Sequence, residues 1–132
     1  MISELEMQDI AEIASTLIAC AMEDGACGVI SLFRGGKNRE GQQAFTIVTD
    51  VRRQTPRGEL LWIDEHLFDV PAARNDFFNA LISRLKPLVE GIEEQWFVRD
   101  EITDRLIVLP AAKPRLRYQH LSHIDQPLSA HT

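Results

Sequence analysis

The segment whose residue types come nearest to known chemistry is the glycine-rich stretch Gly35–Gly41, which carries basic residues and follows a strand-like run. Phosphate-binding loops combine glycines with a lysine, because exposed backbone N–H groups and a positive charge together hold an anion. Such loops lead into a helix, whereas the lysine here is followed by an asparagine and then by a second strand-like run. The stretch therefore predicts a polar hairpin tip. Its candidate contacts for an anion or an acidic partner are Arg34, Lys37 and Arg39.

The histidines offer a second route to chemistry. His120 and His123 have a spacing that suits a metal ion on a helix, and Asp125 follows them. A metal site needs three or four rigidly held ligands, and this segment has no helical period, so no metal site is predicted. His66 shares one side of a predicted strand with Asp64, since alternate residues of a strand face the same way, and an ion pair is expected. No catalytic residue and no cofactor are predicted.

The composition restricts the class of protein. The chain has 132 residues, a hydrophobic content of 45% and a formal net charge of −6, which suits one acidic globular domain. No apolar run approaches the roughly 18 residues of a membrane-spanning helix, and an acidic chain is a poor ligand for nucleic acid. Cys20 and Cys27 are too few for a disulfide framework. We therefore expect a cytoplasmic protein with no membrane or nucleic-acid partner.

The first half of the chain predicts a helix and a meander of strands. Ser3-Glu4-Leu5-Glu6 matches a capping box, and apolar residues then recur with helical period over 3–23. Strand-like runs follow at 29–33, 44–53 and 59–68. Because short connections join antiparallel neighbours, these runs are expected to pair in sequence order.

The second half predicts another helix and a last pair of strands. The helix begins at Pro71, and Pro87 either kinks it or ends it near Lys86. Gln95–Arg99 and Arg105–Leu109 then have the pattern of a hairpin.

Together these elements predict an α+β fold. One antiparallel sheet of about five strands is expected, in the order α-β-β-β-α-β-β, with both helices packed on one face. Residues 1–110 form this single domain, and residues 111–132 form an extended or disordered tail. Deletion of Arg117–Thr132 is accordingly expected to leave the melting temperature nearly unchanged.

Apolar residues on both sides of the same strands are the main sign of a binding surface. Helices on one face of a sheet account for one side of each strand, so the other side needs a separate cover. The predicted interface consists of Leu60, Trp62, Trp96 and Val98. We therefore expect a small non-catalytic interaction or regulatory module that forms a homodimer, with another protein as a further partner class.

Two alternative functions stay open. The element order, small size and acidity are similar to those of class I type III secretion chaperones, and this resemblance implies a dimer that binds unfolded effector segments. It covers Ser3–Leu109 and transfers no residue, and the final helix of such chaperones is not evident in Pro110–Thr132. The other alternative is a PAS-like sensor of a small ligand, which requires a cavity lined by Phe45, Ile47 and Phe78.

Overall fold

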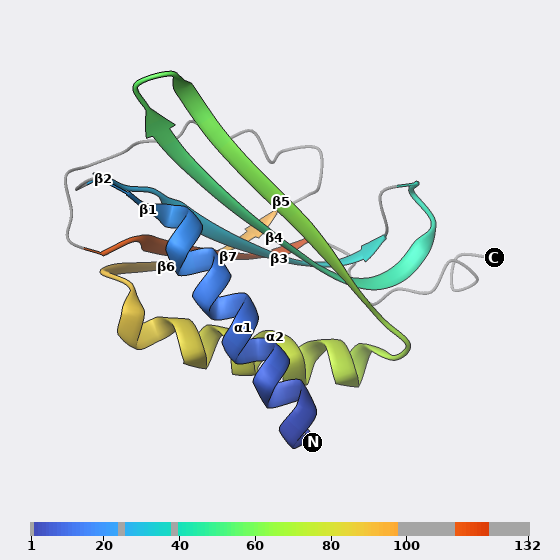
Figure 1. Cartoon of the computed structure of the whole chain (residues 1–132). Helices are drawn as coiled ribbons and strands as arrows, with labels where there is room; N and C mark the ends of the chain where they lie inside the picture. The colour runs from blue at the N-terminus through green and yellow to red at the C-terminus, as the bar shows by residue number, and fades with distance from the viewer. Residues whose placement is uncertain (1, 24–25, 38–39, 98–112, 122–132) are drawn as a thin grey trace.

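The computed structural model describes residues 2–23, 26–37, 40–97 and 113–121. Within them it has an α+β fold, in which two helices accompany a five-stranded sheet and a short two-stranded pair (Figure 1). The helices are α1 (Glu4–Ala21) and α2 (Pro71–Leu85), and the 3-10 turn η1 (Lys86–Leu88) follows α2. The strands are β1 (Met22–Glu23), β2 (Ala26–Cys27), β3 (Val29–Lys37), β4 (Gln43–Thr55), β5 (Gly58–Phe68), β6 (Gly91–Phe97) and β7 (Arg115–Leu121). The predicted α+β class is thus confirmed.

Helix α1 begins where the capping box predicts. The Ser3 Oγ accepts the N–H of Glu6 at 3.1 Å, and Glu6 Oε1 accepts the N–H of Ser3 at 3.3 Å, so two orphan donors are satisfied. The helix ends at Ala21, two residues earlier than predicted, because Met22 and the residue after it pair with β2. Among the described residues, neither α1 nor α2 combines the length and apolar character that crossing a bilayer requires.

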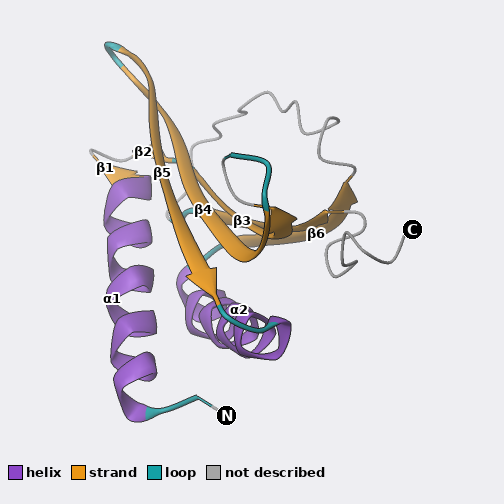
Figure 2. Ribbon diagram, turned by 90° about the vertical axis from the view of Figure 1, so that its right-hand side faces the viewer, coloured by secondary structure: helices purple, strands orange, loops and turns teal. Residues whose placement is uncertain are grey.

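Strands β3, β4 and β5 form the predicted antiparallel meander. Val51 lies opposite Ile30 of β3 and Trp62 of β5, so these three residues share one face of the sheet. At the β4–β5 turn the Thr55 hydroxyl donates to the carbonyl of Gly58 at 2.8 Å. Gly58 has a φ of 121°, a conformation that glycine adopts without strain. The tip of this hairpin projects away from both helices (Figures 1 and 2).

The core lies between one face of the sheet and the two helices, as predicted. Helix α2 ends at Leu85, where Pro87 predicts a stop, and its apolar side faces α1 and the sheet. The buried cluster draws on both helices and on β3, β4 and β7. Its members are Ile10, Ala14, Leu17, Ala21, Ile30, Leu32, Ile47, Val51, Phe77, Phe78, Leu81, Ile82, Leu85, Val89 and Leu116.

The sheet is mixed, which corrects the prediction of a purely antiparallel one. Its strand order is β5-β4-β3-β7-β6, and β7 runs parallel to both of its neighbours. The predicted last hairpin joins Gln95–Arg99 to Arg105–Leu109, and in the described residues β6 covers Gly91–Phe97 and pairs with β7. Arg105–Leu109 lies outside the described residues. An alternating pattern identifies a strand without naming its partner, so the sequence did not indicate the parallel pairing of β7 with β3 and β6.

Residues 115–121 are extended, but as an internal strand rather than as part of a separate tail. Leu116 is 1% exposed, and the ring of Tyr118 meets Phe78 edge-on with centroids 6.3 Å apart. On the other face Arg117 donates to the hydroxyl of Ser31 at 3.2 Å. The arginines that alternate with Leu116 and Tyr118 concealed this strand, because they made the segment polar on average. Residues 122–132 of the predicted tail lie outside the described residues.

Gly28 lies where α1, β3 and β7 meet. Its N–H donates to the carbonyl of Ala21 at 2.7 Å, and its carbonyl accepts the N–H of Arg115 at 3.2 Å. A Cβ at this position would lie 2.2 Å from the carbonyl oxygen of Arg52. Only glycine therefore allows the backbones to approach this closely.

Deletion of Arg117–Thr132 was expected to leave the melting temperature nearly unchanged, but this segment includes most of the internal strand β7. We therefore expect β7 to contribute to stability. We predict that Leu116→Ala lowers the free energy of unfolding by about 2–5 kcal/mol, because it empties a fully buried site. Urea denaturation measures this change. Leu5→Ala is the control, since Leu5 is 70% exposed, and it should shift the same free energy by about 0.5 kcal/mol or less. Equal, small effects of the two substitutions would contradict an internal β7.

Candidate functional site

Strand β5 is the candidate site because it is long and lies at the edge of the sheet. It has 11 residues and, within the described parts of the chain, pairs with β4 alone. An edge strand leaves a row of backbone N–H and C=O groups open to another strand. Its alternate side chains face two different surroundings, because one side of β5 faces the helices and the other side faces away from them.

The side of β5 that faces away from the helices is apolar and exposed. Leu61, Ile63 and Leu67 are 47%, 48% and 63% exposed, and these three residues are here called the β5 stripe. Neighbouring residues of this face on the inner strands are covered, since Ser31 is 1% and Asp50 4% exposed. Solvent therefore reaches large aliphatic groups at the edge of this face, which is typical of a contact surface.

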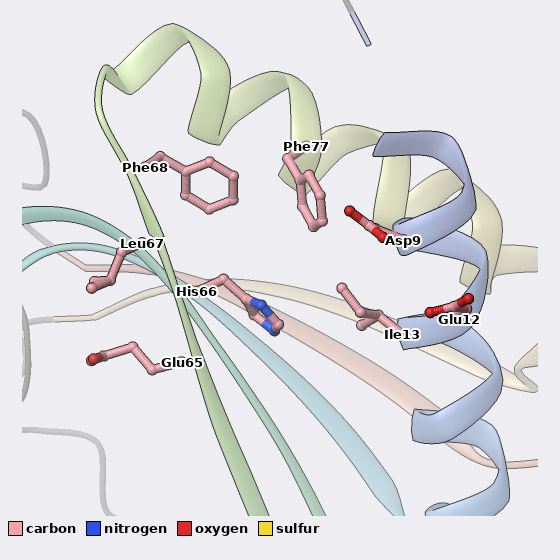
Figure 3. A pocket seen from close by; sticks show the side chains of 8 residues that line it. All are labelled: Asp9, Glu12, Ile13, Glu65, His66, Leu67, Phe68 and Phe77. Atoms are coloured by element: carbon pink, nitrogen blue, oxygen red, sulfur yellow. The ribbon is translucent and has the colours of Figure 1, made fainter. Parts of the chain in front are cut away.

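The side of β5 that faces the helices borders an open cleft of about 460 Å³ between β5, α1 and α2 (Figure 3). The side chains of His66 and Phe68 project from β5 toward Ile13 and Phe77, while Glu65 and Leu67 point away (Figure 3). The full lining is Asp9, Glu12, Ile13, Glu65, His66, Leu67, Phe68 and Phe77. The cleft thus has an aromatic and aliphatic floor with carboxylates at its rim.

His66 projects from β5 into this cleft (Figure 3). Its Nε2 lies 3.8 Å from the Asp64 carboxylate, which gives the predicted ion pair when the imidazole is protonated. The same nitrogen is buried and makes no hydrogen bond. The Phe77 ring stands 6.3 Å from the imidazole and 5.2 Å from Phe68. No serine, cysteine or lysine is among the described residues that line the cleft, so His66 and Asp64 have no nucleophile beside them there.

The three basic residues predicted to share a hairpin tip do not all lie at it. Arg34 is inside β3, where its Nη1 donates to Asn75 Oδ1 at 3.1 Å and its guanidinium lies 5.6 Å from the Phe78 ring centre. Lys37 is exposed at the end of β3, and Arg39 lies outside the described residues. The tip was placed too early because β3 continues through both glycines at 35 and 36.

Arg74 is a buried arginine that sequence reasoning missed. It is 0% exposed, and its Nη1 donates to the carbonyl of Gly35 at 3.0 Å while Nε and Nη2 donate to Asn75 Oδ1 at 3.1 and 2.9 Å. Its guanidinium also lies 5.8 Å from the centre of the Phe45 ring. Arg74 therefore ties the start of α2 to the end of β3. Its position on the apolar stripe of α2, three residues before Phe77, was the available signal.

The four predicted interface residues are spread across the sheet. Leu60 and Trp62 are half-buried on the helix side of β5, and Trp62 packs against the core. Trp96 lies in β6 at the opposite edge, paired with His120, and Val98 is outside the described residues. The structure therefore brings Leu60 and Trp62 together and separates their strand from that of Trp96.

The cleft beside β5 is not lined by the three side chains that the sensor alternative predicted. Ile47 and Phe78 are 0% exposed and belong to the packed core, and Phe45 is half-buried beneath Arg74. The cleft described above lies nearer to the edge of the sheet and has a different lining.

Neither similarity to known proteins nor a cluster of metal ligands in the described residues assigns a function to this chain. No protein-family model, curated protein or solved structure matches the chain. The similarity to secretion chaperones therefore rests on element order, size and charge. In the part of the chain that the structure describes, no three His, Cys, Asp or Glu residues converge as metal ligands.

The different positions of Arg34 and Lys37 give a test of the basic cluster. We predict that Arg34→Ser lowers the free energy of unfolding by about 1–2 kcal/mol, because a hydrogen bond and a cation–π contact are lost. Lys37→Ser, a change at an exposed position, should alter it by about 0.5 kcal/mol or less. Chemical denaturation of both variants measures the difference. If both substitutions left the free energy of unfolding unchanged, the packing of Arg34 against α2 would be contradicted.

Proposed function

We propose that this protein is a non-catalytic protein-interaction module that self-associates through β5. The observation that carries the proposal is the β5 stripe, which presents three large aliphatic side chains at alternate positions of an edge strand. Neither helix covers this face, since both pack on the other one. Covering such a side chain contributes about 1 kcal/mol when it begins half-exposed.

A second copy of the chain is the preferred partner because the β5 stripe is apolar and can pack against the same apolar stripe of that copy. A two-fold axis sets the same patch of each subunit against its twin, so an apolar stripe meets an apolar stripe. Strand pairing at the edge would also satisfy backbone groups that otherwise face solvent. The hairpin tip that begins β5 projects from the body of the protein (Figure 2), which leaves room for another chain beside it.

The cleft supports a second candidate function, the binding of a small ligand. Its aromatic floor and the carboxylates of Asp9 and Glu12 suit a small organic cation that carries N–H donors. Native mass spectrometry of the gently purified protein tests this candidate. A ligand that is retained by the wild type and lost in Phe77→Ala would support it, and a ligand-free wild type would count against it.

Self-association predicts a mass of about two chains for the wild type in sedimentation equilibrium at micromolar concentration. Replacing Leu61 and Ile63 with serine should shift the protein to a monomer, because it removes apolar surface from the centre of the contact and leaves the core untouched. The melting temperature of the variant, measured under conditions where the wild type is monomeric, should change little.

The matched control replaces two exposed leucines elsewhere. Leu5 on α1 and Leu88 in η1 are 70% and 41% exposed, and their double replacement by serine should leave the dimer unchanged. A monomeric wild type at all accessible concentrations would overturn the proposal. A dimer lost equally in both double variants would show that general surface hydrophobicity, rather than β5, drives association.

A further inference from the structure

We infer that the cleft beside β5 receives an arginine side chain of another protein, carried in a segment whose neighbouring residues are aliphatic. This inference deepens the second candidate function, the binding of a cation in the cleft, and rests on it. It does not depend on self-association. The charge at the rim of the cleft, the rings of its floor and the aliphatic groups at its mouth each indicate one part of this partner.

The rim of the cleft that α1 supplies is negatively charged. Asp9 and Glu12 lie three residues apart on this helix, so they share the side that borders the cleft. Both are exposed, and within the described parts of the chain neither carboxylate forms an ion pair. No lysine or arginine is among the described residues that line the cleft. A cation that neutralises these carboxylates would therefore come from outside the cleft lining.

The floor of the cleft suits a planar cation. The rings of Phe68 and Phe77 lie 5.2 Å apart, and the side chain of Asp9 projects from α1 toward Phe77 (Figure 3). A guanidinium fits beside a carboxylate and a ring, because its flat face stacks on the ring while its N–H groups donate to the carboxylate. A lysine ammonium has no such face. This fold packs its own Arg34 and Arg74 over phenyl rings in the same way.

Aliphatic side chains at the mouth of the cleft indicate a protein segment rather than a free cation. Leu67 borders the cleft and is 63% exposed. Leu5 is 70% exposed and lies one turn before Asp9 on the same side of α1. Aliphatic residues next to the bound arginine would cover such groups, which is favourable because it removes apolar surface from water. Leu67 lies four residues beyond Ile63, at the end of the β5 stripe.

The test titrates the wild type with acetyl-Leu-Arg-Leu-amide and with the same peptide carrying citrulline in place of arginine. Citrulline has nearly the shape of arginine but no charge, so its peptide should have a Kd about tenfold higher. Nuclear magnetic resonance at low ionic strength measures both constants, since exposed charges are screened within about 10 Å at 0.1 M salt. The amides of Asp9, His66 and Phe77 should shift.

Substitutions in the cleft assign the two parts of the peptide to the two parts of the site. Asp9→Asn should raise the Kd of the arginine peptide about fivefold and leave that of the citrulline peptide within a factor of about two. Leu67→Ser should raise the Kd of both peptides about threefold. The control Glu90→Gln removes one charge at an exposed position outside the cleft, and it should change neither Kd by more than about twofold.

Acetyl-arginine-amide separates a protein segment from a free cation, and it should bind more weakly than the arginine tripeptide by about fivefold or more. Equal binding of these two would overturn the segment and leave cation binding standing. Equal binding of the arginine and citrulline peptides would overturn the arginine. If no cleft amide shifted with any of the three probes, both the inference and the cation-binding function would be overturned. The double variant L61S/I63S should bind the arginine tripeptide as the wild type does, so a failure of self-association leaves this result unchanged.

Discussion

The packing of both helices on one face of the sheet is the constraint on which the rest of the structure depends. Because strand side chains alternate, each strand has one side that faces the helices and one that faces away from them. In β3 and β4 the side that faces the helices supplies Ile30, Leu32, Ile47 and Val51 to the core, and Ser31 and Asp50 on the other side are buried as well. In β5 the same alternation sends Trp62 inward and Leu61 outward. The β5 stripe is thus exposed because it lies on the side away from the helices and because, among the described strands, β5 has a neighbour on one side alone.

The position of β7 makes this arrangement possible. Inserted between β3 and β6, it joins two parts of the chain that are far apart in sequence and brings Leu116 to the core. Among the strands that the structure describes, β5 and β6 are then the two edges of the sheet. Strand β3 pairs with β7 on one side and with β4 on the other. The strand of the β3–β4–β5 meander that keeps a free edge among the described strands is therefore β5. Gly28 permits this junction, since its backbone bonds to both α1 and β7.

Most elements could be predicted from sequence, whereas their pairing and several side-chain positions could not. The capping box at Ser3, the stop near Pro87 and the meander follow local rules that act over a few residues. The parallel pairing of β7 depends on contacts between distant segments, which no local pattern encodes. Arg34 was assigned to a loop because glycines follow it, yet β3 runs on through them. The alternation that exposes Leu61 was visible, but the exposed side became clear only with the helices in place.

The central claim is that the free edge of β5 pairs with a second copy, and amide hydrogen exchange at single residues tests it most directly. We expect that, at concentrations where the protein is a dimer, the amides of Leu61 and Ile63 exchange as slowly as those of Leu60 and Trp62, and that dilution speeds only the first two. Rapid exchange of Leu61 and Ile63 at every concentration, beside protected Leu60 and Trp62, would contradict it.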